Sequence, residues 1–289
     1  MLKELNANNF FEKTKLKDKE IKVVAMLAPS FAAEFDYPKI ISILKSFGVD
    51  KVVELTFGAK MINRYYHKQL EANKKSKKLI ISSVCPGIVF TIKQKYPKLV
   101  KNLILVDSPM IAMAKICKKT FPKHKVLFIS PCNFKKLEAE NSKYVDFVIN
   151  YQELHKLIEK NKTTLKADGC VSWDKFYNDY TKIYPLSGGL SKTAHLRGII
   201  NKNEVMIIDG INNLEEFLKK TKQRVRFLDV TFCRGGCIGG PYLSKNTSLA
   251  ERKKRLMTYM QVAKKEKIPE CRKGEIKEAK GISFAKTKF

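Results

Sequence analysis

The chain has 289 residues, of which 44% are hydrophobic and 29% are charged, and its formal net charge is +29. This composition is typical of a folded protein with a sizeable core, and it excludes a disordered chain. No run of about 18 apolar residues predicts a membrane helix, and the first residues lack the apolar core of a secretion signal. We therefore expect a protein of the cytoplasm that makes no membrane contact.

Strand-like and helix-like segments alternate along the chain. Short apolar runs predict eight strands, and segments of helical period predict helices between most of them. The strands are expected at residues 22–27, 51–56, 79–84, 103–106, 125–129, 145–149, 205–208 and 226–231. The helices are expected at residues 38–47, 59–72, 88–96, 110–120, 151–160 and 214–220. This alternation favours an α/β fold with parallel sheets covered by helices on both faces.

Eight strands divide in chain order into two lobes of four. The expected regions are an N-terminal extension at 1–20, a first α/β lobe at 21–121, a second α/β lobe at 122–247 and a basic C-terminal helix and tail at 248–289. Each lobe is expected to hold a mostly parallel four-stranded sheet flanked by helices. Ligands of open α/β sheets collect beyond the carboxyl ends of the strands, so the cleft between the lobes is the expected site.

Four of the seven cysteines follow predicted strands within short motifs. Cys85 lies in Val-Cys-Pro-Gly, Cys132 in Ser-Pro-Cys-Asn-Phe-Lys-Lys, and Cys233 and Cys237 share Cys-Arg-Gly-Gly-Cys-Ile-Gly-Gly. A cuboidal iron–sulfur cluster takes one soft sulfur ligand per iron from the protein, so four thiolates from three loops suit such a cluster. The neighbouring glycines let the backbone approach a bulky group closely. An odd number of cysteines, in a chain without a secretion signal, also favours metal binding over disulfides.

These three motifs, in this order, resemble the signature loops of the iron-iron (FeFe) hydrogenase catalytic domain, which is the family of C-terminal domains of the iron hydrogenase large subunit. Two further segments match the family pattern. Ala28-Pro29-Ser30 follows the apolar run at 23–27, and Gly188-Gly189 precedes a helix-like segment. Any one match is weak, but together they extend from about residue 21 to about residue 243.

The resemblance implies a 4Fe–4S cluster bound by the four motif cysteines, Cys85, Cys132, Cys233 and Cys237. It also implies that the thiolate of Cys237 bridges to a two-iron subcluster with carbonyl, cyanide and dithiolate ligands, which completes the H-cluster. Lys135 matches the lysine beside one cyanide, and Ser30 with Pro29 matches the polar contact to the other. The resemblance thus makes Cys237, Lys135, Ser30 and Pro29 candidate catalytic residues, and Ala28 a further cofactor contact.

The resemblance implies a hydrogenase that interconverts two protons and two electrons with H2. No cysteine precedes Cys85, so the chain is similar to the smallest members of the family, and an external low-potential carrier is expected to deliver the electrons. Spread lysine is typical of a solvated surface, but a basic surface also attracts an acidic carrier such as ferredoxin or flavodoxin. Hydrogenase maturation proteins are further expected partners. We expect a monomer, and no nucleic acid, because basic and aromatic residues are not interleaved.

The chain also departs from the family pattern. Val84 occupies the position of the proton-carrying cysteine, and the stretch 57–69 lacks the family's glutamates. Valine cannot relay a proton, so a modest rate is expected. A non-enzymatic hydrogen or redox sensor and a cytosolic iron–sulfur assembly protein of the same fold are therefore alternatives, and a structural zinc site is another. Cys117, Cys170 and Cys271 are interpreted as structural or free thiols.

Overall fold

The computed structural model describes residues 21–76, 78–161, 172–219 and 224–289. The extension predicted for residues 1–20 lies outside this part of the chain. The strands of the described residues are β1 (Val23–Leu27), β2 (Lys51–Glu54), β3 (Ile80–Ile81), β4 (Lys125–Ser130), β5 (Phe147–Asn150), β6 (Val205–Asp209) and β7 (Phe227–Thr231). The α-helices are α2 (Lys39–Ser46), α3 (Thr56–Ala72), α4 (Pro86–Lys95), α5 (Pro109–Thr120), α6 (Phe134–Glu140), α7 (Tyr151–Lys160), α8 (Gly189–Thr193), α9 (Ile211–Lys219) and α10 (Leu249–Lys265).

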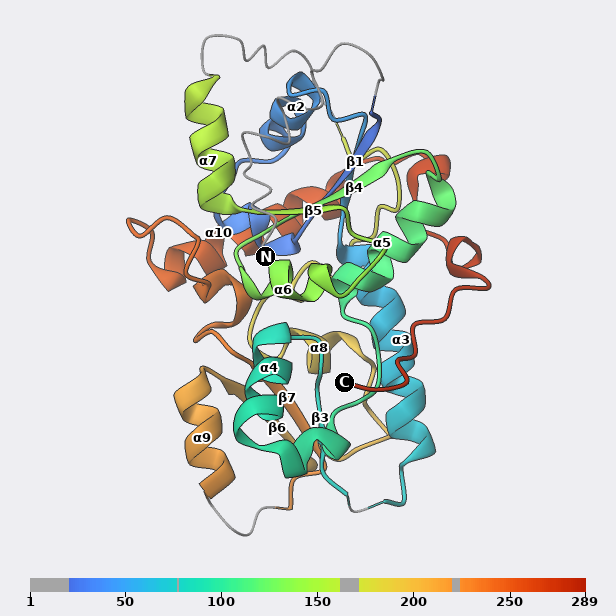
Figure 1. Cartoon of the computed structure of the whole chain (residues 1–289), viewed down its shortest axis with the longest axis vertical. Helices are drawn as coiled ribbons and strands as arrows, with labels where there is room; N and C mark the ends of the chain where they lie inside the picture. The colour runs from blue at the N-terminus through green and yellow to red at the C-terminus, as the bar shows by residue number, and fades with distance from the viewer. Residues whose placement is uncertain (1–20, 77, 162–171, 220–223) are drawn as a thin grey trace.

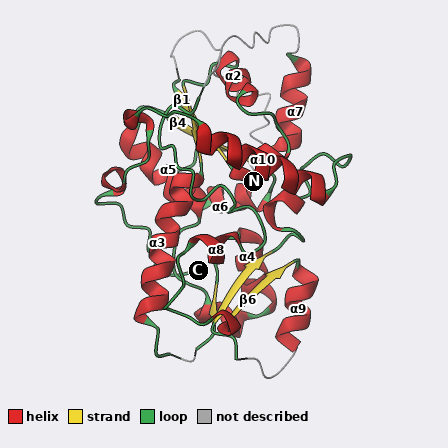
Figure 2. Ribbon diagram, turned by 180° about the vertical axis from the view of Figure 1, so that it is seen from behind, coloured by secondary structure: helices red, strands yellow, loops and turns green. Residues whose placement is uncertain are grey.

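The strands form two parallel sheets, as the alternation of elements predicts. A four-stranded sheet has the order β2-β1-β4-β5, and a three-stranded sheet has the order β3-β7-β6. The two sheets lie toward opposite ends of the long axis, with α6 and α8 between them (Figures 1 and 2). The fold is therefore α/β with helices flanking both sheets.

The predicted partition of strands between two lobes in chain order is wrong. The four-stranded sheet joins β1 and β2 to β4 and β5, and the three-stranded sheet joins β3 to β6 and β7. The boundary expected between residues 121 and 122 therefore does not separate the sheets. Parallel strands always need a crossover connection, and a crossover can deliver the next strand to either sheet. The hydrophobic pattern of a strand does not say which sheet receives it.

The strand predicted at residues 103–106 is also absent from the described sheets. Leu103 forms an isolated parallel bridge with Ile81, whereas Val106 forms an antiparallel bridge with Ala285 near the C-terminus. Leu105 between them is 40% exposed. Because this short apolar segment pairs with two different neighbours, it does not extend the sheet of β3. That sheet has three strands among the described residues, where four were predicted.

Both faces of the four-stranded sheet are covered. Along β1, the alternate residues Val23, Ala25 and Leu27 pack into one buried cluster, while Val24 and Met26 pack into another. The first cluster includes residues of α2, α7 and α10, and the second includes residues of α3 and α5. This arrangement explains why the strand is apolar throughout, since a parallel strand is buried on both sides.

Local sequence signals set several helix ends. Asn150 and Glu153 form a reciprocal capping box at the start of α7, and Ser108 and Ser248 cap α5 and α10. Such side chains satisfy backbone N–H groups that have no partner within the helix. The six predicted helices correspond to α2, α3, α4, α5, α7 and α9, with ends shifted by up to three residues. The basic C-terminal helix predicted after residue 247 is α10.

The segment after α10 packs on the body of the protein. Ser283 O accepts a hydrogen bond from Lys115 Nζ at 2.8 Å, and Phe284 packs against two buried clusters. Figure 1 shows this segment, in red, passing beside α5 and α3. Among the described helices, none combines the length and the apolar character that crossing a membrane requires.

Candidate functional site

Three loops at the carboxyl ends of strands carry the four motif cysteines. Cys85 follows β3 and precedes α4, with Pro86 at the first helical position. Cys132 lies between β4 and α6, and Cys233 and Cys237 follow β7. Because β4 belongs to one sheet and β3 and β7 to the other, the loops approach from both sheets. This confirms that the carboxyl ends of the strands position the motif residues, as predicted.

The four thiols lie within electrostatic range of one another. Burial, together with the neighbouring Cys85 and Cys132, raises the pKa of Cys233 to about 12. Burial and then the other three cysteines raise the pKa of Cys237 well above its usual value. Burial also raises the pKa of Cys132, although the N–H groups of Phe134 and Lys135 donate to its sulfur and oppose this effect. A cationic cluster core would remove these protons by binding the thiolates.

The four thiols are covered by protein to different degrees. Cys237 is surrounded by protein deeply enough for burial to dominate its pKa, yet its side chain keeps exposed surface. Cys85, Cys132 and Cys233 are partly exposed. All four residues therefore keep surface that a bound group could contact. Within the described residues, no three His, Cys, Asp or Glu side chains converge closely enough for a single metal ion, so the thiols are more widely spaced than the ligands of a zinc site.

Glycines hold the loop of Cys237 in close contact with its surroundings. Gly236 has φ +75°, and a Cβ on it would lie 2.5 Å from Pro185 O. A Cβ on Gly239 would lie 1.8 Å from Arg234 O. Cys237 N donates to Pro185 O at 2.7 Å, which fixes the loop against the segment before α8. No residue with a side chain fits at these two glycines without backbone movement.

Lys135 lies beside the thiols, as the motif predicts. Its Nζ is 2.7 Å from Glu138 Oε2, and both side chains are 12% exposed. Burial raises the pKa of Cys132 and of Cys237, and the positive charge of Lys135 acts in the opposite direction by lowering both pKa values. The adjacent Lys136 instead forms an ion pair with Glu153, the capping residue of α7. The two neighbouring lysines therefore have different surroundings.

The Ala28-Pro29-Ser30 segment reaches the same site through a tyrosine. Ser30 is fully buried, and its Oγ lies 2.7 Å from Tyr151 Oη, which also donates to Ala28 O at 3.4 Å. Pro29 is buried at the start of the short 3-10 helix Pro29–Ala33. The hydroxyl of Tyr151 interacts electrostatically with Cys237. Sequence reasoning missed Tyr151, because a tyrosine outside any motif carries no readable signal.

The loop before Cys85 is anchored to α3. Ser83 N donates to Tyr66 Oη at 2.7 Å, and Ser83 Oγ donates to Ile104 O at 2.6 Å. Val84, the residue in the family's proton-carrier position, packs against the apolar cluster that also contains Tyr66 and is contacted by Tyr184. The side chain of Val84 therefore has an apolar structural role here.

The remaining cysteines differ from the motif cysteines in their surroundings. Cys117 is fully buried in an apolar cluster, and burial raises the pKa of its thiol strongly. Cys271 is exposed near the C-terminus, and Cys170 lies outside the described residues. The interpretation of Cys117 as a structural thiol agrees with its packing.

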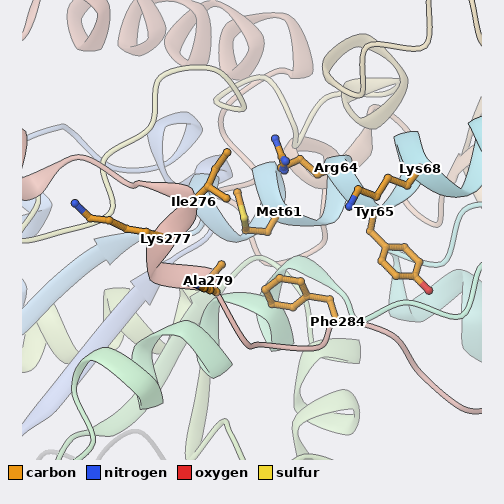
Figure 3. A pocket seen from close by; sticks show the side chains of 9 residues that line it. Met61, Arg64, Tyr65, Lys68, Ile276, Lys277, Ala279 and Phe284 are labelled. Carbon is orange, nitrogen blue, oxygen red and sulfur yellow. The ribbon is translucent and has the colours of Figure 1, made fainter.

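A basic pocket lies between α3 and the C-terminal segment (Figure 3). Its volume is about 340 Å³, and four basic side chains contribute to its lining together with aromatic and aliphatic ones. The lining residues are Met61, Arg64, Tyr65, Lys68, Ile276, Lys277, Ala279, Lys280 and Phe284. None of them is a predicted site residue and none is acidic, and Lys277 forms an ion pair with Glu275 outside the lining.

The residues of the thiol site fit a 4Fe–4S cluster with an attached anionic unit. Four soft donors are present, and they do not converge on a single ion. The glycines let the loop of Cys237 pack closely on neighbouring backbone, and Lys135 supplies a cation near two of the thiols. Tyr184 adds a buried hydroxyl that has no hydrogen-bond partner within the described residues. An acceptor bound at the thiols would satisfy it.

Comparisons with known proteins agree with this geometry. The family model described as "Iron only hydrogenase large subunit, C-terminal domain" matches residues 21–241. Iron hydrogenase 1 of Clostridium pasteurianum is 26% identical over 255 residues, covering 70% of this chain and 44% of that protein. The cytosolic Fe-S cluster assembly factor NAR1 of Encephalitozoon cuniculi is 23% identical, covering 69% of this chain and 61% of the relative. The chain thus spans about half the length of these two relatives.

Solved structures show the same fold. An FeFe-hydrogenase structure from a study of oxygen inactivation superposes with a TM-score of 0.69 at 16% identity, covering 98% of this chain and 96% of that one. A variant of the FeFe-hydrogenase HydA1 from Chlamydomonas reinhardtii gives a TM-score of 0.65 at 15% identity, covering 94% of this chain and 90% of that one. At identities this low, the superpositions establish the fold alone, and the chemistry has to be argued from the residues of the site.

Proposed function

Because the chain belongs to the family of C-terminal domains of iron-only hydrogenase large subunits, we propose that it binds an H-cluster and interconverts two protons and two electrons with H2. One observation carries the proposal. Four thiols from three loops of two different sheets meet within electrostatic range, and a partly buried lysine, Lys135, lies near two of them. Burying thiols and an ammonium group close together costs free energy, so a purely structural role gives no reason for this arrangement.

The side chains of the site have separate roles in this proposal. The four cysteines would hold the cluster, and Cys237 would also contact the two-iron unit. When bound, the H-cluster supplies the hydrogen chemistry itself. Lys135 offers a charged donor to an anionic ligand, and the buried Ser30–Tyr151 pair offers a neutral one. Because these donors are fixed before the cofactor binds, they need little reorganisation.

We propose an acidic external carrier, such as ferredoxin or flavodoxin, as the electron donor. The chain carries a net charge of +29, which attracts an acidic partner. The basic pocket of Figure 3 supports contact with an anionic partner on that face. Hydrogenase maturation proteins would supply the two-iron unit. We propose that the protein acts as a monomer in the cytoplasm.

The proposal is tested by hydrogen evolution from reduced methyl viologen. The protein is reconstituted first with iron and sulfide and then with a synthetic two-iron unit. We expect hydrogen to form only after the second step. A protein that retains both units but forms no hydrogen at any pH is a sensor instead.

An iron–sulfur assembly factor is the second candidate function. Two observations favour it: relatives of this type are about as similar to the chain as the hydrogenases are, and Val84 cannot relay protons. An assembly factor would hold or transfer cubane clusters without needing a two-iron unit. Failure of the reconstituted cubane protein to accept the two-iron unit, with transfer of its cubane to an apo-protein, would establish this alternative. A non-enzymatic sensor, which Val84 also favours, would retain both units without turnover.

Replacing Lys135 with alanine is expected to weaken retention of the two-iron unit by about 1.5–3 kcal/mol, because an anionic ligand loses its charged donor. The cubane should remain, since Lys135 is not one of its ligands. The measurement is the iron content and the infrared cyanide bands after gel filtration. Lys136→Ala is the matched control, because Lys136 pairs with Glu153 and should leave the bands unchanged. Unchanged bands in Lys135→Ala would remove Lys135 from the cofactor site.

Replacing Val84 with cysteine is expected to raise hydrogen evolution if proton delivery limits the rate. A thiol beside the cofactor supplies the protonatable group that valine lacks, and such assistance contributes at most about 10²–10⁴-fold. The gain should be smaller here, because α3 offers Tyr66 and no glutamate opposite this loop. Rates are compared over a range of pH at equal cofactor occupancy. No increase at any pH would show that another step limits turnover.

A further inference from the structure

The hydroxyl of Tyr184 is buried beside the thiol site without a partner. Its Oη has no hydrogen-bond partner within the described residues, although the ring itself is partly exposed. Burial raises the pKa of Tyr184 strongly, so the hydroxyl keeps its proton and remains a donor. Buried polar groups in folded proteins almost always have a partner, because an unpaired one loses its hydrogen bonds to water without gaining others. An unpaired donor at a functional site therefore indicates an acceptor that binds there.

The backbone next to Tyr184 is in direct contact with the loop of Cys237. Pro185 O accepts the hydrogen bond from Cys237 N at 2.7 Å, and the same oxygen leaves no room for a side chain at Gly236. Tyr184 immediately precedes Pro185, and its hydroxyl interacts electrostatically with Cys237. The hydrogen bond from Cys237 N thus fixes the residue next to Tyr184 against the loop of Cys237.

Two of the three groups that interact electrostatically with the hydroxyl already have hydrogen-bond partners. Asp229, an electrostatic neighbour of Tyr184, accepts bonds from Ser191 N at 2.8 Å and from Ser191 Oγ at 2.7 Å. Tyr66, a second neighbour, accepts a bond from Ser83 N. Of the three neighbours of Tyr184, Cys237 is the one whose side chain is exposed, whereas Asp229 and Tyr66 are buried.

We infer that the hydroxyl of Tyr184 donates a hydrogen bond to an anionic acceptor held at Cys237. This inference rests on the proposed function, because the acceptor is either the cluster-bound thiolate of Cys237 or an anionic ligand of the two-iron unit attached to it. Tyr184 is a positioning and tuning residue in both cases. A hydrogen bond to a cluster sulfur stabilises the more negative, reduced state and so raises the reduction potential. The side chain should therefore tune the potential of the site as well as hold its ligand.

The test is Tyr184→Phe, which removes the hydroxyl and keeps the ring that fills the space. Tyr180→Phe is the matched control: Tyr180 lies in the same segment, but its hydroxyl contacts His195 at the surface at 3.3 Å. Iron content, urea unfolding and the reduction potential of the cubane are measured on protein reconstituted with iron and sulfide alone. Infrared cyanide and carbonyl bands are then measured after the two-iron unit is added.

We expect all three proteins to bind the same amount of iron. A lower cubane potential in Tyr184→Phe, with Tyr180→Phe unchanged, identifies the acceptor as sulfur. Unchanged potentials with shifted infrared bands identify it as a ligand of the two-iron unit. If neither property differs from the parent protein while the cluster is present, the inference about Tyr184 is wrong and the proposed function stands. If the parent protein binds no cluster, both are wrong.

Discussion

Replacing any one of the four motif cysteines with alanine is expected to lose or rearrange the cubane cluster. The parent protein should bind about four irons before any two-iron unit is added, because each thiolate supplies one iron with its protein ligand. The four thiols interact electrostatically with one another, so the loss of one leaves an iron facing an apolar methyl group. Iron content and the visible absorption of the reconstituted protein measure the effect.

Two cysteines outside the motifs provide the controls. Cys271 is exposed, and Cys271→Ala should change neither iron content nor stability. Cys117 is fully buried in the apolar cluster of α5, so Cys117→Ala should lower stability but keep the full iron content. Loss of the cluster in the Cys117 variant, combined with retention in Cys85→Ser, would falsify the assigned ligand set.

Replacing Lys182 with methionine is expected to destabilise the protein by about 3–5 kcal/mol, the cost of breaking a buried ion pair on one side. Lys182 Nζ lies 2.5 Å from Glu54 Oε2 at the end of β2, and their side chains are 0% and 1% exposed. Burial raises the pKa of Glu54 in spite of this lysine, and the other carboxylate oxygen, Oε1, has no partner among the described residues. Without the ammonium, the carboxyl group is left buried with fewer donors.

The same pair connects three parts of the chain. Tyr259 of α10 accepts hydrogen bonds from Lys182 Nζ at 2.8 Å and from Trp173 Nε1 at 3.2 Å. The ammonium also lies 4.5 Å from the centre of the Tyr259 ring, where a cation is attracted to the aromatic face. The network thereby joins β2, the segment before α8 and α10.

The free energy of unfolding is measured by urea titration. Lys273→Met is the matched control, because Lys273 forms a lysine–glutamate pair with Glu270 at the surface, where such pairs contribute about 0–1 kcal/mol. The double variant Glu54→Leu with Lys182→Met should recover much of the lost stability, since it leaves no uncompensated buried charge. A Lys182→Met variant as stable as the parent would show that Glu54 is neutral and needs no cation.

Sequence reasoning placed the local features of this fold better than the long-range ones. The strands before Cys132 and Cys233 and the helix that begins at Tyr151 are set by short apolar runs and capping residues, which any window of the chain reveals. The pairing of β3 with β7, nearly 150 residues apart, depends on three-dimensional packing and leaves no local mark. This is why the strands were assigned to the wrong lobes while their positions were largely correct.

The candidate site shows the same contrast. The cysteines and Lys135 lie in compact motifs, so their convergence could be predicted from the family resemblance. Tyr184 and Tyr151 could not, because their importance lies in a single hydroxyl placed beside Cys237 by contacts between distant segments. The buried Lys182–Glu54 pair was equally hidden, since lysines occur throughout this chain and only burial distinguishes this one.

The interleaving of the two sheets bears on how the protein is made in the cell. Cys85 leaves the ribosome long before Cys237, and at about 5–20 residues per second the delay is roughly 8–30 s. β3, which precedes Cys85, pairs with β7, which follows almost 150 residues later, so its sheet cannot form before β7 has been made. The four thiols consequently cannot meet before the segment that carries Cys237 has left the ribosome. A cluster that needs all four thiolates can therefore be loaded only after that point.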